Sequence, residues 1–484
     1  MMNASSTGIK RGIIKRSHSD SDDAIDLALA KFFFGCNVSF NVIESEVFKS
    51  FIHLVKPDYK IPSRKKLSTH LLDKVHNEVM SKSVKQTETT GVLLIDGWKN
   101  SAANTKLVAC TIHTVTEGSL YLNSWDLTGF KETGNALAKI VDEATEIART
   151  RYNISIYAVV SDNASAMLLM GNLVNLWHVT CASHSANLLA KSLVDANFAE
   201  SINKLLRRFK QSGPEKEIIK NGGQKIILAC ETRWCSYRDA FRCCLRNLTI
   251  MREMVKNEKI TLKNDISEIL CSKDFEQTLQ NYIMIFDPVC ELINKCQRSE
   301  TNIADACEEW FKLRLPTVDD GYEKIIEERL KKVLKPAILT ANFLHPVYKG
   351  KRFMHQEEYR DEVHNFLKKE LRAENLRDHF GVQSFLDCKG IFQTLNTKNL
   401  TSPQTYWFLI EKQYPDLANL AQKLLKIPSS SAEIERLFSH WSFVHSDIRN
   451  RLTIERSQKL IQIYYSMKTM DKLHGHDDDD FDCV

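Results

Sequence analysis

The sequence predicts an α/β protein in which a mixed β-sheet is interrupted by a large all-helical insertion and preceded by a small helical domain. Short apolar runs rich in β-branched residues are concentrated between residues 91 and 181, whereas apolar residues on both sides recur at helical spacing. The composition, 43% hydrophobic and 26% charged, is that of an ordinary globular protein. At 484 residues the chain is long enough for several domains.

The segment from residue 91 to 193 determines the fold class. Its helical patterns are residues 134–151, a helix that opens at Asn163, and residues 184–193. Its strand candidates are short β-branched or aromatic runs, and they comprise residues 91–98, 106–115, 119–127, 154–161 and 176–181. The order β-β-β-α-β-α-β-α, with the first three strands antiparallel, is typical of ribonuclease-H-like folds.

Changes of pattern along the chain predict six segments. Residues before 24 and after 470 are polar or acidic without apolar periodicity, which is typical of solvated tails. Residues 236–426 have a helical pattern throughout, as if a helical domain had been inserted into the sheet-containing unit. The predicted segments are a tail at 1–23, a helical N-terminal domain at 24–88, a core at 89–235, the helical insertion at 236–426, C-terminal helices that complete the core at 427–470, and an acidic tail at 471–484.

The overall charge gives no reason by itself to expect a polyanionic partner. It is +5, from 66 basic and 61 acidic residues, so DNA would have to bind local patches. Residues 204–210 and 349–352 are basic enough to contact DNA, but each also fits a solvated helix face. The basic cluster within residues 10–16 fits either a solvated tail or a nuclear-import signal.

The cysteines and the apolar runs indicate a soluble protein in a reducing compartment. Thirteen cysteines occur at irregular spacings and no signal peptide precedes them, so we expect free thiols rather than a disulfide framework. The most apolar stretches, such as residues 91–95 and 106–115, are far shorter than the ~20 residues that a membrane-spanning helix needs.

Three acidic residues stand where a metal site could form. Asp96 lies in or just after the first strand, Asp162 ends the fourth, and Glu435 lies early in a helix that begins near Ser431. Strand ends at one edge of a sheet converge even when their sequence positions are far apart. Carboxylates are ligands that Mg²⁺ prefers, and two such ions can drive phosphodiester cleavage. Alternatively, Asp96 caps the turn at Gly97 and Asp162 caps the following helix.

Five short blocks resemble successive signatures of hAT DNA transposases and occur in that family's order. One block alone is a weak signal, whereas five in order are specific. The resemblance runs from about residue 25 to about residue 467, and its last part resembles the family's C-terminal dimerisation region. The blocks are 96–98 (DGW), 161–167 (SDNASAM), 181–188 (CASHSANL), 231–234 (ETRW) and 431–439 (SAEIERLFS), followed by 449–452 (RNRL).

The resemblance implies a nuclear DDE-type transposase. Such an enzyme hydrolyses DNA at transposon ends, forms a hairpin on flanking DNA and transfers the freed 3′-hydroxyl to target DNA. Asp96, Asp162 and Glu435 would be its catalytic residues and would hold two Mg²⁺ or Mn²⁺ ions. Glu433 competes for the third position, but the Glu-Arg-Leu-Phe-Ser match favours Glu435. The C-terminal region would mediate self-association, and no membrane partner is implied.

The resemblance also implies DNA contacts. Trp234 would stack on a base displaced during cleavage, although core packing fits this residue equally well. Arg233 would pair with a phosphate or with a nearby carboxylate. Cys181 and His184 resemble half of a zinc site, but no second pair at zinc-finger spacing lies nearby. We therefore expect His184 to contact the DNA backbone and Cys181 to be a small buried residue, although a structural pair in the core fits both residues nearly as well. Arg436 is a further candidate DNA contact.

The chain departs from the family pattern at its N-terminal end. Full-length hAT transposases commonly begin with a BED-type zinc finger, whereas this chain contains no Cys-x-x-Cys pair and Cys36 is its only cysteine before residue 100. Two functions therefore remain open from the sequence. One is an active metal-dependent transposase. The other is a domesticated, catalytically silent protein that dimerises and tethers partners to chromatin.

Overall fold

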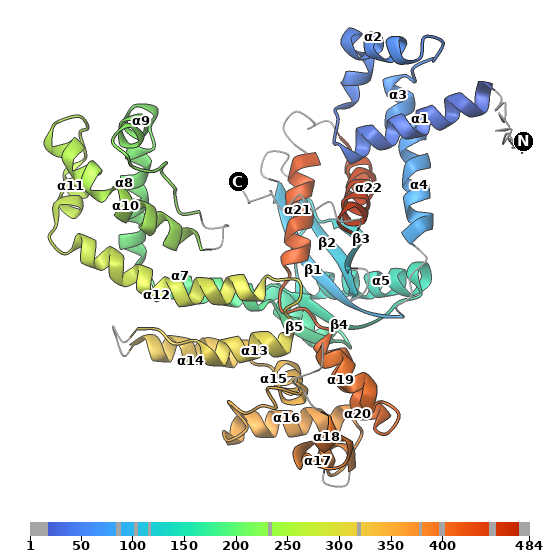
Figure 1. Ribbon diagram of the computed structural model, residues 1–484, viewed down its shortest axis with the longest axis vertical. Coiled ribbons are helices and arrows are strands. Elements are labelled where there is room, and N and C mark those ends of the chain that lie inside the picture. Colours follow the sequence, from blue (N-terminus) through green and yellow to red (C-terminus); the bar gives the residue numbers. More distant parts are fainter. Residues whose placement is uncertain are drawn as a thin grey trace, which may run out of the picture.

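The computed structural model describes residues 18–83, 89–100, 105–114, 118–230, 235–316, 321–376, 380–395, 402–444 and 452–473. A mixed five-stranded sheet lies at its centre, and two groups of helices extend away from the sheet (Figure 1). No helix within these ranges is both long enough and apolar enough to span a bilayer.

The sheet has the strand order β3-β2-β1-β4-β5. The first three strands pair antiparallel, as predicted, while β4 pairs parallel with both β1 and β5. The helices between them also follow the predicted order. These elements are β1 Thr90–Asn100, β2 Thr105–Thr114, β3 Gly118–Asp126, α5 Gly134–Tyr152, β4 Ser155–Ser161, α6 Ser165–Leu173, β5 Trp177–Thr180 and α7 Ala182–Ser192.

The two faces of the sheet are covered by different helices. Leu93 and Ile95 of β1 pack in a core that α5 and α6 complete. Val92 and Leu94 belong to a second, larger core that includes residues of α7 and of the C-terminal helices. Because successive strand residues point to opposite faces, Asp96 shares the face of Leu94.

Helix α5 shows how the chain is turned into the central strand β4. The Thr133 side chain caps its start by accepting a hydrogen bond from the Ala136 backbone N–H, at 3.3 Å. Asn153 ends it in the left-handed conformation, with φ of 56°, which asparagine tolerates better than most residues. The chain then enters β4 at Ser155.

The N-terminal helices form a small unit against the C-terminal helix α22. Its first helix begins at His18, so residues 18–23, which we expected in a tail, are helical. One ion pair joins this extension to the rest of the unit, because Asp22 contacts Lys56 at 3.0 Å. The elements are α1 His18–Gly35, the 3-10 helix η1 Phe40–Glu44, α2 Glu46–Val55, α3 Arg64–Lys66, the π-helix η2 Leu67–Leu71 and α4 Leu72–Ser83.

A long helical stretch follows α7. It begins at Ala196, upstream of the boundary at 236 expected from the sequence, because α8 packs against α10 and places Phe198 5.7 Å from Phe241. Apart from the bridge between Asn302 and Pro428, no strand interrupts its described residues. The helices are α8 Ala196–Phe209, α9 Ser212–Lys220, α10 Ser236–Lys256, α11 Asn264–Cys271, α12 Phe275–Cys296, α13 Ile303–Lys312, α14 Gly321–Val333, α15 Pro336–Leu344, α16 Glu357–Glu370, α17 Phe380–Leu386, α18 Ile391–Thr394, α19 Pro403–Ile410 and α20 Pro415–Leu425.

The last two helices return to the sheet. Helix α21, Ala432–Val444, packs on β1 and β2, and α22, Ile454–Leu473, packs on β3 (Figure 1). The Gln458 side chain donates hydrogen bonds of 2.9 Å to the backbone carbonyl and the hydroxyl of Ser124 in β3. Helices at the C-terminal end therefore cover part of a sheet whose last strand ends at Thr180.

Candidate functional site

Two aspartates lie just beyond the last paired residues of the adjacent parallel strands β1 and β4. Leu94 of β1 pairs with Val160 of β4, and Asp96 and Asp162 each stand two residues further along. Continuing this register places Asp96 and Asp162 at the same level on strands about 4.8 Å apart. The two-residue steps also place both side chains on the face of Leu94 and Val160, which belong to the same core.

Each aspartate uses one oxygen to hold the local backbone. Asp96 Oδ1 accepts a hydrogen bond from the Gly97 N–H at 2.7 Å, and Asp162 Oδ1 accepts one from the Ala164 N–H at 2.9 Å. These are not the caps considered from the sequence, because Asp96 and Gly97 lie within β1 and helix α6 begins at Ser165 without a side-chain cap. Among the described residues, the second oxygen of each carboxylate accepts no hydrogen bond, so one oxygen on each is free for another role.

Glu435 reaches the same face from the first turn of α21. At the helix start, the Ser431 hydroxyl lies 3.4 Å from Glu435 Oε1. The segment before the helix is tied down, because Ser429 donates a 2.7 Å hydrogen bond to the Cys296 carbonyl and accepts one of 2.9 Å from the Ala182 N–H. Helix α21 is thus anchored to α12 and to the start of α7.

Aromatic rings join the strand of Asp96 to the helix of Glu435. The Trp98 ring stacks on Phe438, with 6.1 Å between ring centroids and 9° between planes, and lies 6.0 Å from Trp441. Trp98 is two residues beyond Asp96, on the same strand face, and Phe438 is three residues beyond Glu435, on the same side of the helix. The stack therefore holds the two acids toward one another.

The three carboxylates influence one another electrostatically. Burial, followed by the charges of Asp162 and Glu435, raises the pKa of Asp96 well above its usual range, although the Gly97 hydrogen bond opposes this. Burial raises the pKa of Glu435 to about 7, with Asp162 adding to the rise and Ser431 and Arg436 opposing it. Like charges thus meet at this end of the sheet.

Glu433 lies on another side of α21, although it is only two residues from Glu435. Its Oε2 is 3.1 Å from His113 Nδ1 of β2. Burial alone would raise the pKa of Glu433, but the contact with His113, together with Ser119 and Arg436, holds it below its usual value. Glu433 therefore has a partner of its own and is not coupled to the aspartates.

His184 lies near Asp162, at the start of α7. Burial lowers its pKa, and the charges of Lys191 and Arg329 lower it further, while Asp162 opposes them. Cys181 is buried, as expected for a small core residue, and its sulfur accepts hydrogen bonds of 3.4 Å from the backbone N–H groups of His184 and Ser431. Cys181 thus links α7 to α21.

The structure describes only one of the three other predicted DNA contacts. Arg436 is exposed beside Glu435 and donates a 3.3 Å hydrogen bond to the Gln297 carbonyl. Arg233 and Trp234 lie outside the described residues, as does the basic cluster at 10–16. The structure therefore brings together the three acids, His184 and Arg436.

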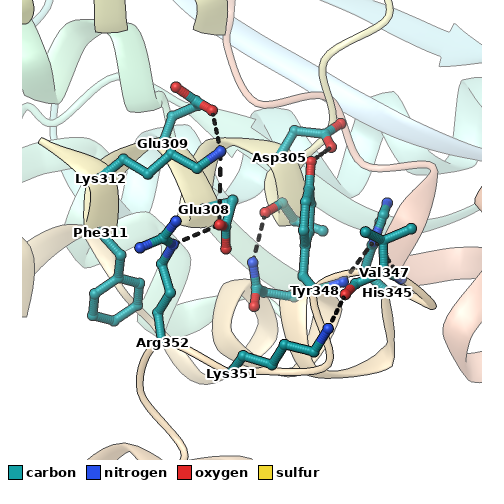
Figure 2. A network of polar contacts seen from close by, with 12 residues as sticks. Asp305, Glu308, Glu309, Phe311, Lys312, His345, Val347, Tyr348, Lys351 and Arg352 are labelled. Atoms are coloured by element: carbon teal, nitrogen blue, oxygen red, sulfur yellow. Dashed lines mark hydrogen bonds and ion pairs between the residues drawn. The ribbon is translucent and has the colours of Figure 1, made fainter.

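The two basic stretches have internal partners. Arg352 contacts Glu308 at 2.5 Å, and Lys312 lies 3.7 Å from the same carboxylate, as Figure 2 shows. In the other stretch, Lys204 pairs with Glu200 at 2.9 Å and Arg208 donates to the Thr261 carbonyl at 3.2 Å. These contacts support a structural role for part of each stretch.

Two residues near the site had no signal in the sequence. Glu132 raises the pKa of Asp96 by its charge, and its Oε2 lies 2.6 Å from Lys106 Nζ. Arg329 of α14 is half-buried close enough to His184 to lower the pKa of that side chain. Glu132 lies in the loop before α5 and Arg329 lies in α14, and neither spacing nor motif predicts that these segments reach the site.

The three acids have side chains of the kind that bind divalent cations. They supply hard carboxylate oxygens, and their mutual repulsion is of the kind that a bound cation relieves. Within the described ranges, however, no group of three or more His, Cys, Asp or Glu side chains is arranged to hold a metal ion. A closed ligand set would therefore need the side chains to move closer together.

Comparisons with known proteins cover both parts of the site. Residues 62–211, which include Asp96, Asp162 and His184, match a domain of unknown function (DUF659). Residues 383–467, which include Glu435 and Arg436, match the hAT family C-terminal dimerisation region. Over 519 aligned residues, or 87% of the chain, 24% are identical to a Zea mays protein described as an AC transposase, and the chain spans 62% of that protein's length. Residues 383–467 therefore carry the hAT family C-terminal dimerisation region, and most of the chain is similar to a transposase.

Proposed function

We propose that this chain is a hAT-type transposase, or a protein derived from one, that hydrolyses phosphodiester bonds and transfers DNA strands at a ribonuclease-H-like site. Asp96, Asp162 and Glu435 are its catalytic residues. The proposal is supported by the position of Asp96 and Asp162 on neighbouring strands and by the charges of Asp162 and Glu435, which together with burial raise the pKa of Asp96. Like charges are costly to place together unless the site uses them.

Each acid has a distinct support in this chain. Asp96 and Asp162 each keep one oxygen on a backbone N–H, which fixes the carboxylate orientation and leaves the second oxygen to bind a cation. Glu435 supplies the third set of oxygens from α21. Two Mg²⁺ or Mn²⁺ ions held there would activate the attacking oxygen and stabilise the leaving oxygen of the phosphodiester.

The proposed partners are DNA, at transposon ends and at the target site, and a second copy of the chain. His184 and Arg436 flank the acids and present nitrogen donors to the DNA backbone, and Arg233 and Trp234 are the further proposed contacts. The dimerisation match supports self-association. Action on chromosomal DNA places the protein in the nucleus.

A cleavage assay tests the proposal. The purified full-length chain is incubated with Mn²⁺ and a duplex that carries the terminal repeats flanking its own gene. We expect nicking at the repeat ends, reduced at least about 100-fold in Asp96→Asn. Glu433→Gln is the matched control, because that acid lies on the same helix but pairs with His113. Equal nicking by wild type and a folded Asp96→Asn would contradict the proposal.

A catalytically silent protein that acts through self-association is the second candidate. The dimerisation match supports it, and within that region Phe408 and Leu409 of α19 are 66% and 47% exposed. Phe438 and Trp441 are buried against Trp98, so they are not available to a partner. In this case, Phe408→Ser would weaken the dimer in sedimentation experiments, while Asp96→Asn would change no cellular phenotype. An Asp96-dependent phenotype would exclude it.

A further inference from the structure

A cleft in the helical insertion combines basic side chains with aromatic rings. It lies between α13, α14, the loop after α15 and the start of α16, and its volume is about 1000 Å³. Small-molecule sites have volumes of roughly 300–1000 Å³, so the cleft is large enough for a nucleotide. The three acids at the end of the sheet are not among its lining residues. We propose that this cleft binds a nucleoside triphosphate.

Three basic side chains that line the cleft have no acidic partner within the described part of the chain. Arg314 Nη1 donates to two backbone carbonyls, at 2.9 and 2.7 Å, and Lys351 Nζ donates to one at 3.1 Å. Lys331 of α14 makes no hydrogen bond or ion pair with any described residue. All three side chains are exposed. These cations therefore remain unpaired, and Arg and Lys bind phosphate oxygens through charge-assisted hydrogen bonds.

Two further basic side chains belong to the ion-pair network at the wall of the cleft. Arg352 contacts Glu308 at 2.5 Å, and Lys312 lies 3.7 Å from the same carboxylate. In the view of Figure 2, Arg352 lies between the Phe311 ring and Lys351. Because its partners offset the charge of Glu308, this acid opposes an anion in the cleft only weakly. The network thus forms a rigid wall beside the unpaired cations.

Aromatic rings and carboxylates suited to a base line the same cleft. Phe311 and Tyr359 are half-buried and meet edge to face, with 5.7 Å between ring centroids, and Phe311 also stacks on the buried Phe353 at 5.2 Å. Burial raises the pKa of Tyr359, and the charges of Glu358 and Glu327 raise it further, so both carboxylates lie near this ring. Aromatic rings hold bases by stacking, and carboxylates accept hydrogen bonds from base N–H groups.

A nucleoside triphosphate carries both kinds of group that these residues recognise. Its phosphates match the unpaired cations, and its planar base with N–H donors matches the rings and the carboxylates beside them. The walls come from four segments of the chain, so they can surround a small ligand on several sides. This inference does not depend on the proposed DNA cleavage, because it uses none of the residues assigned to that reaction.

Calorimetric titration tests the proposal with three probes. ATP, inorganic triphosphate and adenosine are each titrated into the purified full-length chain in EDTA, which prevents a metal ion from holding the nucleotide at the acidic site. We expect one ATP to bind per chain, triphosphate to bind more weakly, and adenosine to bind most weakly. This order follows if the cations supply most of the affinity and the rings add to it.

Substitutions locate the two halves of the ligand. Lys331→Gln and Lys351→Gln should each weaken the binding of ATP and of triphosphate at least about tenfold. Lys332→Gln is the matched control, because Lys332 is exposed on the same helix but does not line the cleft. Tyr359→Leu should weaken ATP at least about fivefold and leave triphosphate unchanged. Thermal unfolding verifies that each variant is folded.

The outcomes separate this inference from the proposed function. If neither ATP nor triphosphate binds, or if Lys332→Gln weakens ATP as much as Lys331→Gln does, the cleft is not a nucleotide site. If ATP and triphosphate bind equally and Tyr359→Leu changes neither, the nucleoside half of the proposal is wrong. If duplex DNA displaces ATP from the cleft, a DNA phosphate is the true ligand and the proposal is overturned. Absence of DNA cleavage by a chain that binds ATP as expected counts against the proposed function alone.

Discussion

The acidic site and the ion-pair network around Glu308 both gather charged side chains from separate helices or strands. The acidic site brings together charges of one sign, whereas the network pairs charges of opposite sign. Beyond the last paired residues of β1 and β4, burial and the charges of Asp162 and Glu435 raise the pKa of Asp96, and burial and Asp162 raise the pKa of Glu435. In the network, each acid has a basic or hydroxyl partner (Figure 2).

In the network, basic partners lower the pKa of an acid that burial would otherwise raise. Glu309 lies 2.7 Å from Lys295 and 2.9 Å from Lys312, and these contacts outweigh burial and hold the pKa of Glu309 below its usual value. Such pairing joins α12, α13 and the loop before α16 into one frame. The contrast teaches that clustered charge alone does not mark a functional site. Like charges gathered at one buried place are the stronger sign.

The largest effect on stability is expected when the aromatic stack beside the acidic site is removed. Phe438→Ala should lower the free energy of unfolding by about 3 kcal/mol, because Phe438 is buried against Trp98. Urea unfolding followed by tryptophan fluorescence measures this. Phe408→Ala is the control, since Phe408 is exposed, and equal destabilisation by the two changes would contradict the account.

Removing one cation from the network should cost somewhat less. Arg352→Gln leaves Glu308, which is 10% exposed, with only Lys312 at 3.7 Å. We expect a loss of about 2 kcal/mol, below the full cost of breaking a buried pair because Arg352 is itself 41% exposed. Lys351→Gln is the matched control, because Lys351 contacts only the Val347 carbonyl. Chemical unfolding that does not separate these two variants would show that the network stabilises nothing.

At the acidic site, removing a charge should stabilise the fold rather than destabilise it, and a pH series measures this effect. The pKa of Glu435 is raised from 4.5 to about 7 in the folded chain, so its contribution is fully present below pH 4.5 and is lost as the pH rises through 7. Glutamine does not ionise, so Glu435→Gln does not lose stability in this way as the pH rises. Its stability relative to wild type should therefore increase by about 1 to 2 kcal/mol between pH 4.5 and 8, after allowing for partial exposure. A flat difference across that range would refute the raised pKa of Glu435.

A smaller effect is expected for Asp96→Asn. In EDTA at pH 7.5 this change should raise the free energy of unfolding by about 1 kcal/mol, because it removes a carboxylate held among like charges. Mn²⁺ should then stabilise wild type but not the variant, since ligands bind the folded state preferentially. Thermal unfolding with and without Mn²⁺ measures both. Destabilisation by Asp96→Asn in EDTA would argue that the carboxylate is a structural cap.

The sheet and two of its acids could be predicted because local pattern determines them. The β-branched runs after residue 90 predicted the strands, and the parallel register of β1 and β4 brings Asp96 beside Asp162 without further information. Glu435 needed the resemblance, since no spacing rule relates it to the strands. Glu132 and Arg329 could not be found, because the loop before α5 and helix α14 reach the site only through tertiary packing. The starts of α1 and α8 were missed for the same reason.

Calorimetric titration of Mn²⁺ into the metal-free chain tests the central claim most directly. Asp96→Asn, Asp162→Asn and Glu435→Gln are compared with wild type and with Glu433→Gln, which alters a neighbouring acid that pairs with His113. We predict that wild type and Glu433→Gln bind Mn²⁺ alike, and that each of the other three variants binds at least about tenfold more weakly. Wild-type affinity in a folded Glu435→Gln variant would contradict a shared cation site.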